Sequence, residues 1–354
     1  MDSVLPAAAG TMRAMWEPFQ EAAERLGLSF KLTAGLVAVA TVSGTLEGQR
    51  VHAAWGDRAT AVRAELDPPL DLGLHITSKA FVTLPSLSER VLLGDSNWDD
   101  EVVATADEAP RGATLFDGDA RRALLGLNAS SVDFLVTDDR VESYVMQFDA
   151  SLLETALHHV ARVASLMDRE RAKIPVPSVL AAHAEALRRL SRERGLSIEQ
   201  TPLRVSGVLG PARVTVRSER KGRGTYHLHV RAEPIEGSLG TGLLVRRESL
   251  VDRVRKIGGY QDLQTGDAAF DPMFLVQAQD GARALAGLDA DARALLVDLA
   301  RRFECVEIDE GGLTAHGPAR MCPAPEMVSL IEAATAVVDR IARASAAELR
   351  GPYR

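Results

Sequence analysis

The sequence repeats itself once, and this internal repeat constrains the fold more than any other feature. Residues 94–99 (GDSNWD) match residues 266–271 (GDAAFD), 172 positions later. The same offset holds through the next helical stretch, where Asp117, Asp119, Ala120, Arg121, Leu124 and Leu127 fall on Asp289, Asp291, Ala292, Arg293, Leu296 and Leu299. Upstream, the offset becomes 168, and VRAE at 62–65 matches VRAE at 230–233. Collinear matches with gaps only at turns indicate the duplication of one domain.

The order of predicted elements in each copy defines the fold class. Apolar residues recur at helical spacing over 12–26 and 179–190, and an alternating, strand-like pattern follows in both copies. The predicted strands are Leu36 to Leu46, Val51 to Trp55 and Ala61 to Leu66, then Leu203 to Leu209, Ala212 to Arg217 and Tyr226 to Ala232. Each copy is then completed, in this order, by a short strand, the Gly-Asp segment, another strand, a capped helix, a hairpin and a long amphipathic helix. We predict an α+β fold, a tandem duplication in which each antiparallel sheet is packed by an N-terminal and a long C-terminal helix.

Two prolines mark the expected boundary between the copies. The run 173–178 (KIPVPS) blocks helix continuation and favours an extended spacer, with Ser178 as the expected N-cap of the next helix. We therefore predict a first α+β repeat at 1–172, a proline-containing linker at 173–178 and a second α+β repeat at 179–354. A chain of 354 residues is long enough for two domains that each bury their own core.

The cysteines and the apolar runs bear on the compartment. Cys305 and Cys322 form no disulfide framework and no cluster with metal-ligand spacing, which favours a reducing interior. The first residues lack a basic segment followed by an apolar one, and the longest nearly apolar run, Leu32 to Val42, is too short to span a bilayer. Abundant alanine and arginine with little lysine are typical of a GC-rich bacterial genome. We expect a bacterial, cytoplasmic protein without a membrane segment.

The repeated Gly-Asp segment allows two interpretations. Asp95 with Asp99, and Asp267 with Asp271, could act as paired carboxylates in metal or acid–base chemistry. A hard divalent cation needs six or more oxygen ligands, and no matching run of acids is present. We favour a structural role, in which glycine forms the turn, aspartate accepts backbone N–H groups, and Trp98 or its counterpart anchors the turn in the core.

His227 and His229 alternate in a predicted strand, so both imidazoles should lie on one face. They are weak candidates for metal ligands, because a third ligand is not evident; His52, His75 and His316 could contribute only if the fold brings them near. The sequence shows no nucleophile elbow and no phosphate-binding loop. We therefore predict no cofactor and no catalytic residue, and the absence of a motif favours a non-enzyme without deciding the question.

Charge is distributed unevenly along the chain. Residues 217–256 contain ten Lys/Arg and five Asp/Glu, whereas residues 94–142 contain twelve acids and four arginines, in a chain of net charge -8. We predict that residues 217–223 form a basic hairpin loop, and that a partner binds there. The candidate binding residues are Arg217, Arg220, Lys221 and Arg223, followed along the chain by Arg246, Arg247, Arg253, Arg255 and Lys256.

Residues 266–283 resemble a family of bacterial domains of unknown function. The shared pattern is an acidic residue, then Phe-Asp/Glu-x-x-Phe-x-Val, then Asp and Ala-Arg before a leucine-rich helix. In this chain the pattern is carried by Asp267, Phe270, Asp271, Phe274, Val276, Asp280, Ala282 and Arg283. The resemblance implies a bacterial domain, attached to membrane segments in some members of the family. It implies no activity and no site residue.

Three functional hypotheses follow from the sequence. The first is a non-catalytic cytoplasmic adaptor or assembly protein, whose partner is another protein or a second copy of this chain with its acidic half facing the basic loop. The second is a small-molecule or lipid binder with a pocket between the sheet and the closing helix, lined by Val160, Val163 and Met167 or by Val338 and Ile341. The third is a metal-dependent hydrolase built on His227 and His229. Nucleic acid is not expected as the partner, because the basic segment lacks interleaved aromatic residues.

Overall fold

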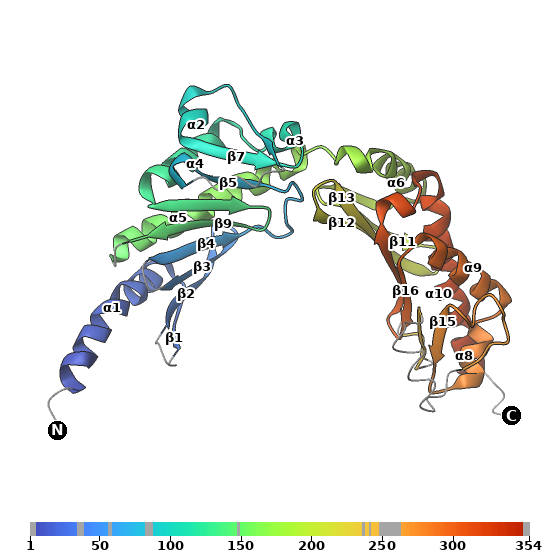
Figure 1. The fold of residues 1–354 in the computed structure, drawn as a ribbon. Coiled ribbons are helices and arrows are strands. Elements are labelled where there is room, and N and C mark those ends of the chain that lie inside the picture. The colour runs from blue at the N-terminus through green and yellow to red at the C-terminus, as the bar shows by residue number, and fades with distance from the viewer. Residues whose placement is uncertain are drawn as a thin grey trace. The chain divides into compact units, whose positions relative to one another are not determined.

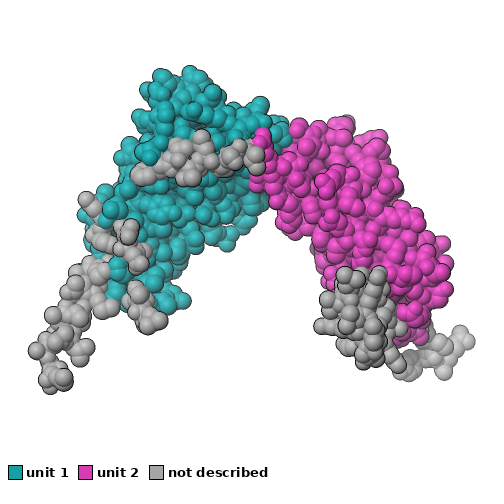
Figure 2. Space-filling model, in the orientation of Figure 1, with its two compact units in different colours: residues 1–175 teal, residues 176–354 magenta. Residues whose placement is uncertain are grey.

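The structure is a computed structural model that describes residues 5–33, 39–55, 59–81, 88–146, 149–235, 238–240, 242–247 and 263–349. The chain divides into two compact units, Met1–Pro175 and Val176–Arg354, which Figure 2 shows in different colours. The predicted linker at 173–178 spans this division, and its exact bounds remain a prediction. Arg253, Arg255 and Lys256, which were expected to extend the basic segment, lie outside the described residues.

The described residues of the first unit form a nine-stranded sheet flanked by helices. Its strand order is β1-β2-β3-β4-β9-β8-β5-β7-β6, and neighbouring strands are antiparallel. The elements are α1 (Leu5–Leu26), β1 (Ser29–Thr33), β2 (Val39–Leu46), β3 (Gln49–Trp55), β4 (Thr60–Glu65), β5 (His75–Ser78), β6 (Glu89–Arg90), α2 (Ser96–Glu101), β7 (Val102–Ala106), α3 (Ala109–Ala113), α4 (Gly118–Ser130), β8 (Asp133–Thr137), β9 (Arg140–Val145) and α5 (Ala150–Glu170).

The second unit contains an eight-stranded antiparallel sheet in the order β10-β11-β12-β13-β17-β16-β14-β15. The elements are α6 (Ala181–Arg194), β10 (Ser197–Gln200), β11 (Leu203–Leu209), β12 (Ala212–Gly222), β13 (Thr225–Pro234), β14 (Leu244–Arg247), β15 (Phe274–Gln277), α8 (Gly281–Gly287), α9 (Ala290–Arg302), β16 (Cys305–Asp309), β17 (Gly312–Pro318) and α10 (Met327–Leu349). Each of these strands has a counterpart at the same place in the first sheet. The predicted α+β fold with a tandem duplication is therefore confirmed.

Each sheet buries one face against its opening and closing helices (Figure 1). In the first unit α5 packs on β3, β4 and β9, and α1 packs on β1 and β2; in the second, α10 packs on β12, β13 and β17, and α6 on β10 and β11. Alternate strand residues such as Val62 and Val230 are fully buried, as the two-residue period of a strand requires. The closing helices present apolar stripes to this face, which include Leu157, Val160, Ile331 and Val338. Burial of these apolar stripes is the main contribution that holds the helices against each sheet.

The Gly-Asp turn has the same structure in both units. In the first, the N–H groups of Leu93 and Gly94 donate to the two carboxylate oxygens of Asp99 (3.2 and 3.0 Å), and Trp98 is fully buried. Gly94 has a φ of 69°, which glycine adopts without strain. In the second, Thr265 and Gly266 donate to Asp271 (3.1 and 3.0 Å), and Phe270 takes the place of the tryptophan. The structural interpretation of this motif is confirmed.

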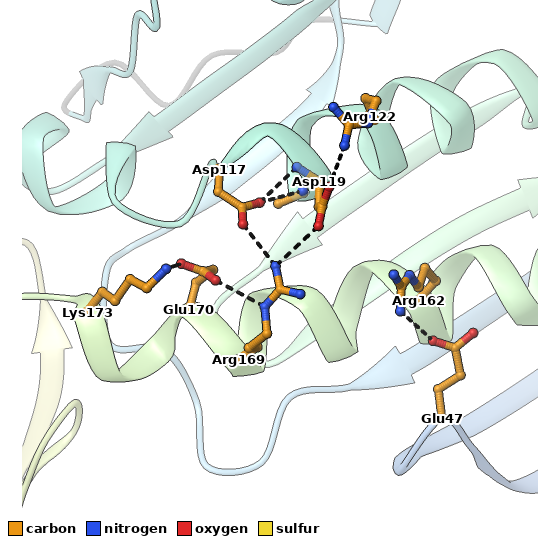
Figure 3. A network of polar contacts seen from close by, with 9 residues as sticks. Glu47, Asp117, Asp119, Arg122, Arg162, Arg169, Glu170 and Lys173 are labelled. Carbon is orange, nitrogen blue, oxygen red and sulfur yellow. Dashed lines mark hydrogen bonds and ion pairs between the residues drawn. The ribbon is translucent and has the colours of Figure 1, made fainter.

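A second repeated contact ties the capped helix to the closing helix (Figure 3). Asp117 caps α4 by accepting the N–H of Ala120 (2.8 Å), and Arg169 of α5 donates to the same carboxylate (2.9 Å). Glu170 is buried between Arg169 and Lys173, which both bind its carboxylate. In the second unit, Asp289 caps α9 and accepts from Arg340 of α10 (2.6 Å). We call the Asp117–Arg169 and Asp289–Arg340 contacts the helix clamps.

Several local expectations were wrong. The predicted N-cap at Ser178 lies inside a 3-10 turn (Ser178–Leu180), and Leu180 occupies the cap of α6. Strand β12 continues to Gly222 rather than ending at Arg217, because its alternation of buried and exposed residues persists through Ser218. The edge strands β1 and β10 were not predicted, since they are short and mostly exposed. Side chains of Met12 and Met15 in the opening helix, and residues 36–38 of an expected strand, lie outside those described.

Candidate functional site

The face of the second sheet opposite α6 and α10 carries polar side chains. Along most of β12 and β13, and in the middle of β17 and the first half of β11, buried residues alternate with exposed or half-exposed ones. We call this side of the second sheet its polar face. Its residues include Arg204, Ser206, Arg213, Thr215, Arg217, His227, His229, Arg231, Thr314 and His316.

Backbone register places four of these side chains, together with Cys305 of β16, in one line across the sheet. Arg204 on β11 lies opposite Arg217 on β12, and Arg217 lies opposite His229 on β13. His229 lies opposite His316 on β17, which in turn lies opposite Cys305 on β16. Cross-strand neighbours on one face of a sheet interact directly. We call Arg204, Arg217, His229, His316 and Cys305 the second-unit row.

The arginines of this region carry charges that the described chain does not neutralise. No hydrogen bond or ion pair joins the side chain of Arg204, Arg213 or Arg217 to another described residue, and all three are exposed. The first-unit counterpart of Arg213 is Arg50, which pairs with Glu65 (3.0 Å) and Asp67 (2.8 Å). The same position therefore holds a neutralised arginine in one copy and an unpaired one in the other.

The two histidines of the row contact each other. The rings of His229 and His316 stack with centroids 5.1 Å apart and an interplanar angle of 20°. Oε2 of Glu219 lies 2.7 Å from Nε2 of His229. Burial lowers the pKa of His229 below its ordinary value, and Arg217 and His316 lower it further, whereas Glu219 opposes the shift. The neutral imidazole is therefore favoured, and the arginines supply the positive charge of the row at neutral pH.

The residues predicted to form a basic loop occupy the end of a hairpin. Arg217 lies within β12 on the polar face, and the turn between β12 and β13 consists of Arg223 and Gly224. Lys221 is bound to Glu219, and a hydrogen bond from Lys221 lowers the pKa of that carboxyl. Arg220 and Arg223 also have interaction partners in the structure. Of the four predicted binding residues, Arg217 is the one whose charge stays unpaired.

Sequence reasoning found His227 and His229 and named His316 as a possible third ligand, but it missed Arg204 and Arg213. His227 and His229 do lie on one face, as their spacing predicted. Among the described residues, no group of three or more His, Cys, Asp or Glu side chains is arranged to hold a metal ion. Burial raises the pKa of the Cys305 thiol, so the thiolate is disfavoured. The missed residues could have been found from the alternation of strands 203–209 and 212–217, which places them on the polar face.

The equivalent line in the first unit has different chemistry at every position. Register places Thr41, Ala54, Ala61, Tyr144 and Asp133 side by side across β2, β3, β4, β9 and β8. We call these residues the first-unit row. A nearby depression of about 320 Å³ is lined by charged side chains, among them Arg50, Arg63, Glu65 and Arg140. The copies thus share a scaffold but not the side chains of this line.

The space between each sheet and its closing helix is filled by side chains. Val160, Val163 and Met167 are at most 1% exposed and belong to the first core; Val338 and Ile341 belong to the second. Two surface depressions are lined by other, mostly polar residues. One is lined by residues such as Asp119, Arg122 and Arg162, and the other by residues such as Asp280, Arg283 and Glu310. No helix among the described residues combines the length and the apolarity that a membrane span requires.

Comparisons with known proteins give one partial match to a solved structure. Neither a protein-family model nor a curated protein matches the chain. The crystal structure of the mycobacterial trehalose monomycolate transport factor A, TtfA, aligns with 44% of this chain and 94% of its own, at 10% identity and a TM-score of 0.33. A likeness of that extent carries no functional argument. The function must therefore be inferred from the polar faces themselves.

Proposed function

We propose that the protein is a non-catalytic cytoplasmic adaptor or assembly protein that binds partner proteins through the polar faces of its two pseudo-equivalent sheets. The second-unit row carries this proposal, because it differs from the first-unit row at all five positions. Free thiols at Cys305 and Cys322 suit a reducing compartment. Two linked binding surfaces can also raise avidity for a partner that contacts both.

Residues shared by the two copies are explained by folding. The Gly-Asp turn satisfies backbone N–H groups through Asp99 and Asp271, and the helix clamps join the capped helix to the closing helix in each unit. These contacts need no ligand to account for them. Specific recognition is therefore best sought where the copies differ on an exposed surface.

The second-unit row is not explained by stability. Like charges directly opposite each other on adjacent strands are destabilising, by roughly 0.2–1 kcal/mol. Arg204 and Arg217 form such a pair, and the first unit holds the uncharged Thr41 and Ala54 at the same positions. A bound anionic partner would attract both guanidinium groups and so offset the repulsion between them. Binding therefore gives the pair a physical role.

A second copy of the chain is less favoured as the partner. The acidic half, residues 94–142, was expected to face the basic segment, but ten of its twelve carboxylates have a hydrogen bond or ion pair within the chain. Asp138, for example, accepts the N–H groups of Leu72, Gly73 and Leu74. The other two residues, Asp107 and Glu108, also have an interaction partner. Because these charges serve the fold, we favour a partner other than the chain itself.

Affinity purification with a row-reverted variant tests the proposal. The variant replaces Arg204→Thr, Arg217→Ala, His229→Ala and His316→Tyr, which are the residues that the first unit carries in the same line. The tagged wild-type chain, expressed in the cells that naturally make it, is expected to retain a partner that the variant loses. Because the first sheet folds with these residues, the variant should also fold.

Arg301→Ala provides the matched control. Arg301 is an exposed arginine of α9, a helix that packs against α10 on the other side of the sheet. The control removes one positive charge from the surface and is expected to retain the partner. If the row-reverted variant unfolds like the wild type and yet recovers the same partners in equal amounts, the proposed surface is wrong.

A further inference from the structure

We propose that Arg204, Arg217 and Arg213 of the second sheet form a recognition site for an extended acidic segment of a partner protein. This inference rests on the proposed function and adds the chemistry of the partner. All three side chains are exposed and have no partner among the described residues. Each is therefore available to form a charge-assisted, bidentate contact with a carboxylate.

The spacing of the arginines suits carboxylates on one extended chain. Arg204 and Arg217 lie on adjacent strands and face each other, so their Cα atoms are about 5 Å apart. Arg217 and Arg213 lie four residues apart on β12, which is about 13 Å along the strand. An extended peptide presents alternate side chains about 7 Å apart on one side. Two acidic residues in such a peptide, separated by three others, would reach both ends of this site.

The surrounding charges favour an acidic peptide over a nucleic acid. Glu219, Glu233 and Glu307 are half-buried among the basic side chains of the polar face. Arg231 binds Glu233 (2.6 Å), so part of the positive charge is already used. A nucleic acid strand presents a phosphate at every nucleotide and would meet these carboxylates as well. A peptide can place neutral residues opposite them, and the chain as a whole carries a charge of -8.

At the positions of Arg204, Arg213 and Arg217 the two units differ in charge and in pairing. In the first unit Arg50 has two carboxylate partners, and the positions of Arg204 and Arg217 hold Thr41 and Ala54. Glu233 lies opposite Arg213 but is bound to Arg231, whereas Glu65 of the first unit binds Arg50. At these three positions the second sheet holds guanidinium groups that no described residue neutralises, where the first sheet has a paired arginine or an uncharged side chain. Elsewhere on the polar face of the first sheet, Arg63 is also exposed and has no hydrogen bond or ion pair to a described residue.

Fluorescence anisotropy of a labelled peptide tests this site directly. The probe is a fluorescein-labelled octapeptide in which three serines separate two glutamates, titrated with the chain at low salt. We expect Arg204→Thr/Arg217→Ala to weaken binding about tenfold, because two exposed ion pairs are lost. Arg301→Ala is expected to bind as the wild type does, and raising the salt concentration should weaken wild-type binding.

Other outcomes overturn the proposal. Equal binding by the wild type and the double variant would show that these arginines do not recognise the peptide. Tighter, arginine-dependent binding of a labelled single-stranded DNA 12-mer would show that the site prefers phosphates. If the peptide fails to bind while the row-reverted variant still loses its partner in affinity purification, the acidic chemistry is wrong and the proposed function stands.

Discussion

A double-mutant cycle on Arg204 and Arg217 tests whether these side chains repel each other in the free protein. Register places them directly opposite on β11 and β12, and neither has a carboxylate partner among the described residues. Single replacements, Arg204→Thr and Arg217→Ala, each remove one charge of the pair. Either single replacement already abolishes the repulsion between the two charges, so the second replacement brings no further relief. The effects on the unfolding free energy should therefore not be additive.

The expected coupling is small but measurable. Two unit charges about 6 Å apart in water repel each other by about 0.7 kcal/mol. Salt screening lowers this value, and measured cross-strand charge pairs contribute about 0.2–1 kcal/mol. We expect about 0.5 kcal/mol at low ionic strength, which is about 1–2 °C in melting temperature for a unit of this size. The cycle separates this energy from the different strand propensities of arginine, threonine and alanine.

Urea unfolding of the four proteins, followed by circular dichroism, supplies the free energies. The measurement is made at low salt and again at about 1 M NaCl, where the Debye length falls to about 3 Å and the coupling should vanish. Coupling of the opposite sign would mean that the two arginines stabilise each other, for example through a shared anion. Additive effects at low salt would remove the argument that the pair is costly in the free protein.

Four further measurements test other parts of the account. Asp117→Ala and Asp289→Ala each remove a helix cap and a clamp contact, and each should lower the unfolding free energy in urea by about 1–2 kcal/mol, whereas Asp100→Ala, in an exposed and looser pair, should cost less. Trp98→Ala should cost about 3–5 kcal/mol by the same assay, because it empties a fully buried site. His229 has a lowered pKa, so the unfolded chain takes up a proton near pH 6.5 before the folded chain does. Stability should therefore fall as pH drops below about 6.5, and His229→Ala should reduce that loss. Light scattering at low salt should give the mass of one chain, 38.0 kDa, and a concentration-dependent dimer would restore the self-association hypothesis.

Local patterns in the sequence were sufficient for the scaffold. Glycine followed by aspartate predicted the turn at 94–99, and the aspartate before each capped helix predicted the caps at Asp117 and Asp289. These contacts form between residues that are near each other in the sequence, so short motifs report them. The two-residue alternation likewise predicted that His227 and His229 share a face. The duplication extended each of these predictions from one copy to the other.

The candidate site could not be predicted in the same way, because it depends on register. Arg204, Arg217, His229 and His316 come from four strands, and nothing in the local sequence states which residues face each other. A one-residue shift in pairing would separate them. The charge counts were also misleading, since Asp95 and the other acids of the first unit are engaged by nearby arginines and backbone N–H groups. The number of charged residues in a segment does not show which of them are paired with an opposite charge.

Site-specific photo-crosslinking in cells tests the central claim most directly. A photoreactive benzoylphenylalanine replaces Thr215 or Thr314, which lie beside the second-unit row on the polar face, or Arg301 on α9 as the control. We predict a crosslinked partner from the two polar-face positions, lost when Arg204→Thr and Arg217→Ala are added, and none from Arg301. Crosslinks from Arg301 that equal those from Thr215 and Thr314, or polar-face crosslinks that persist without the arginines, would contradict the account.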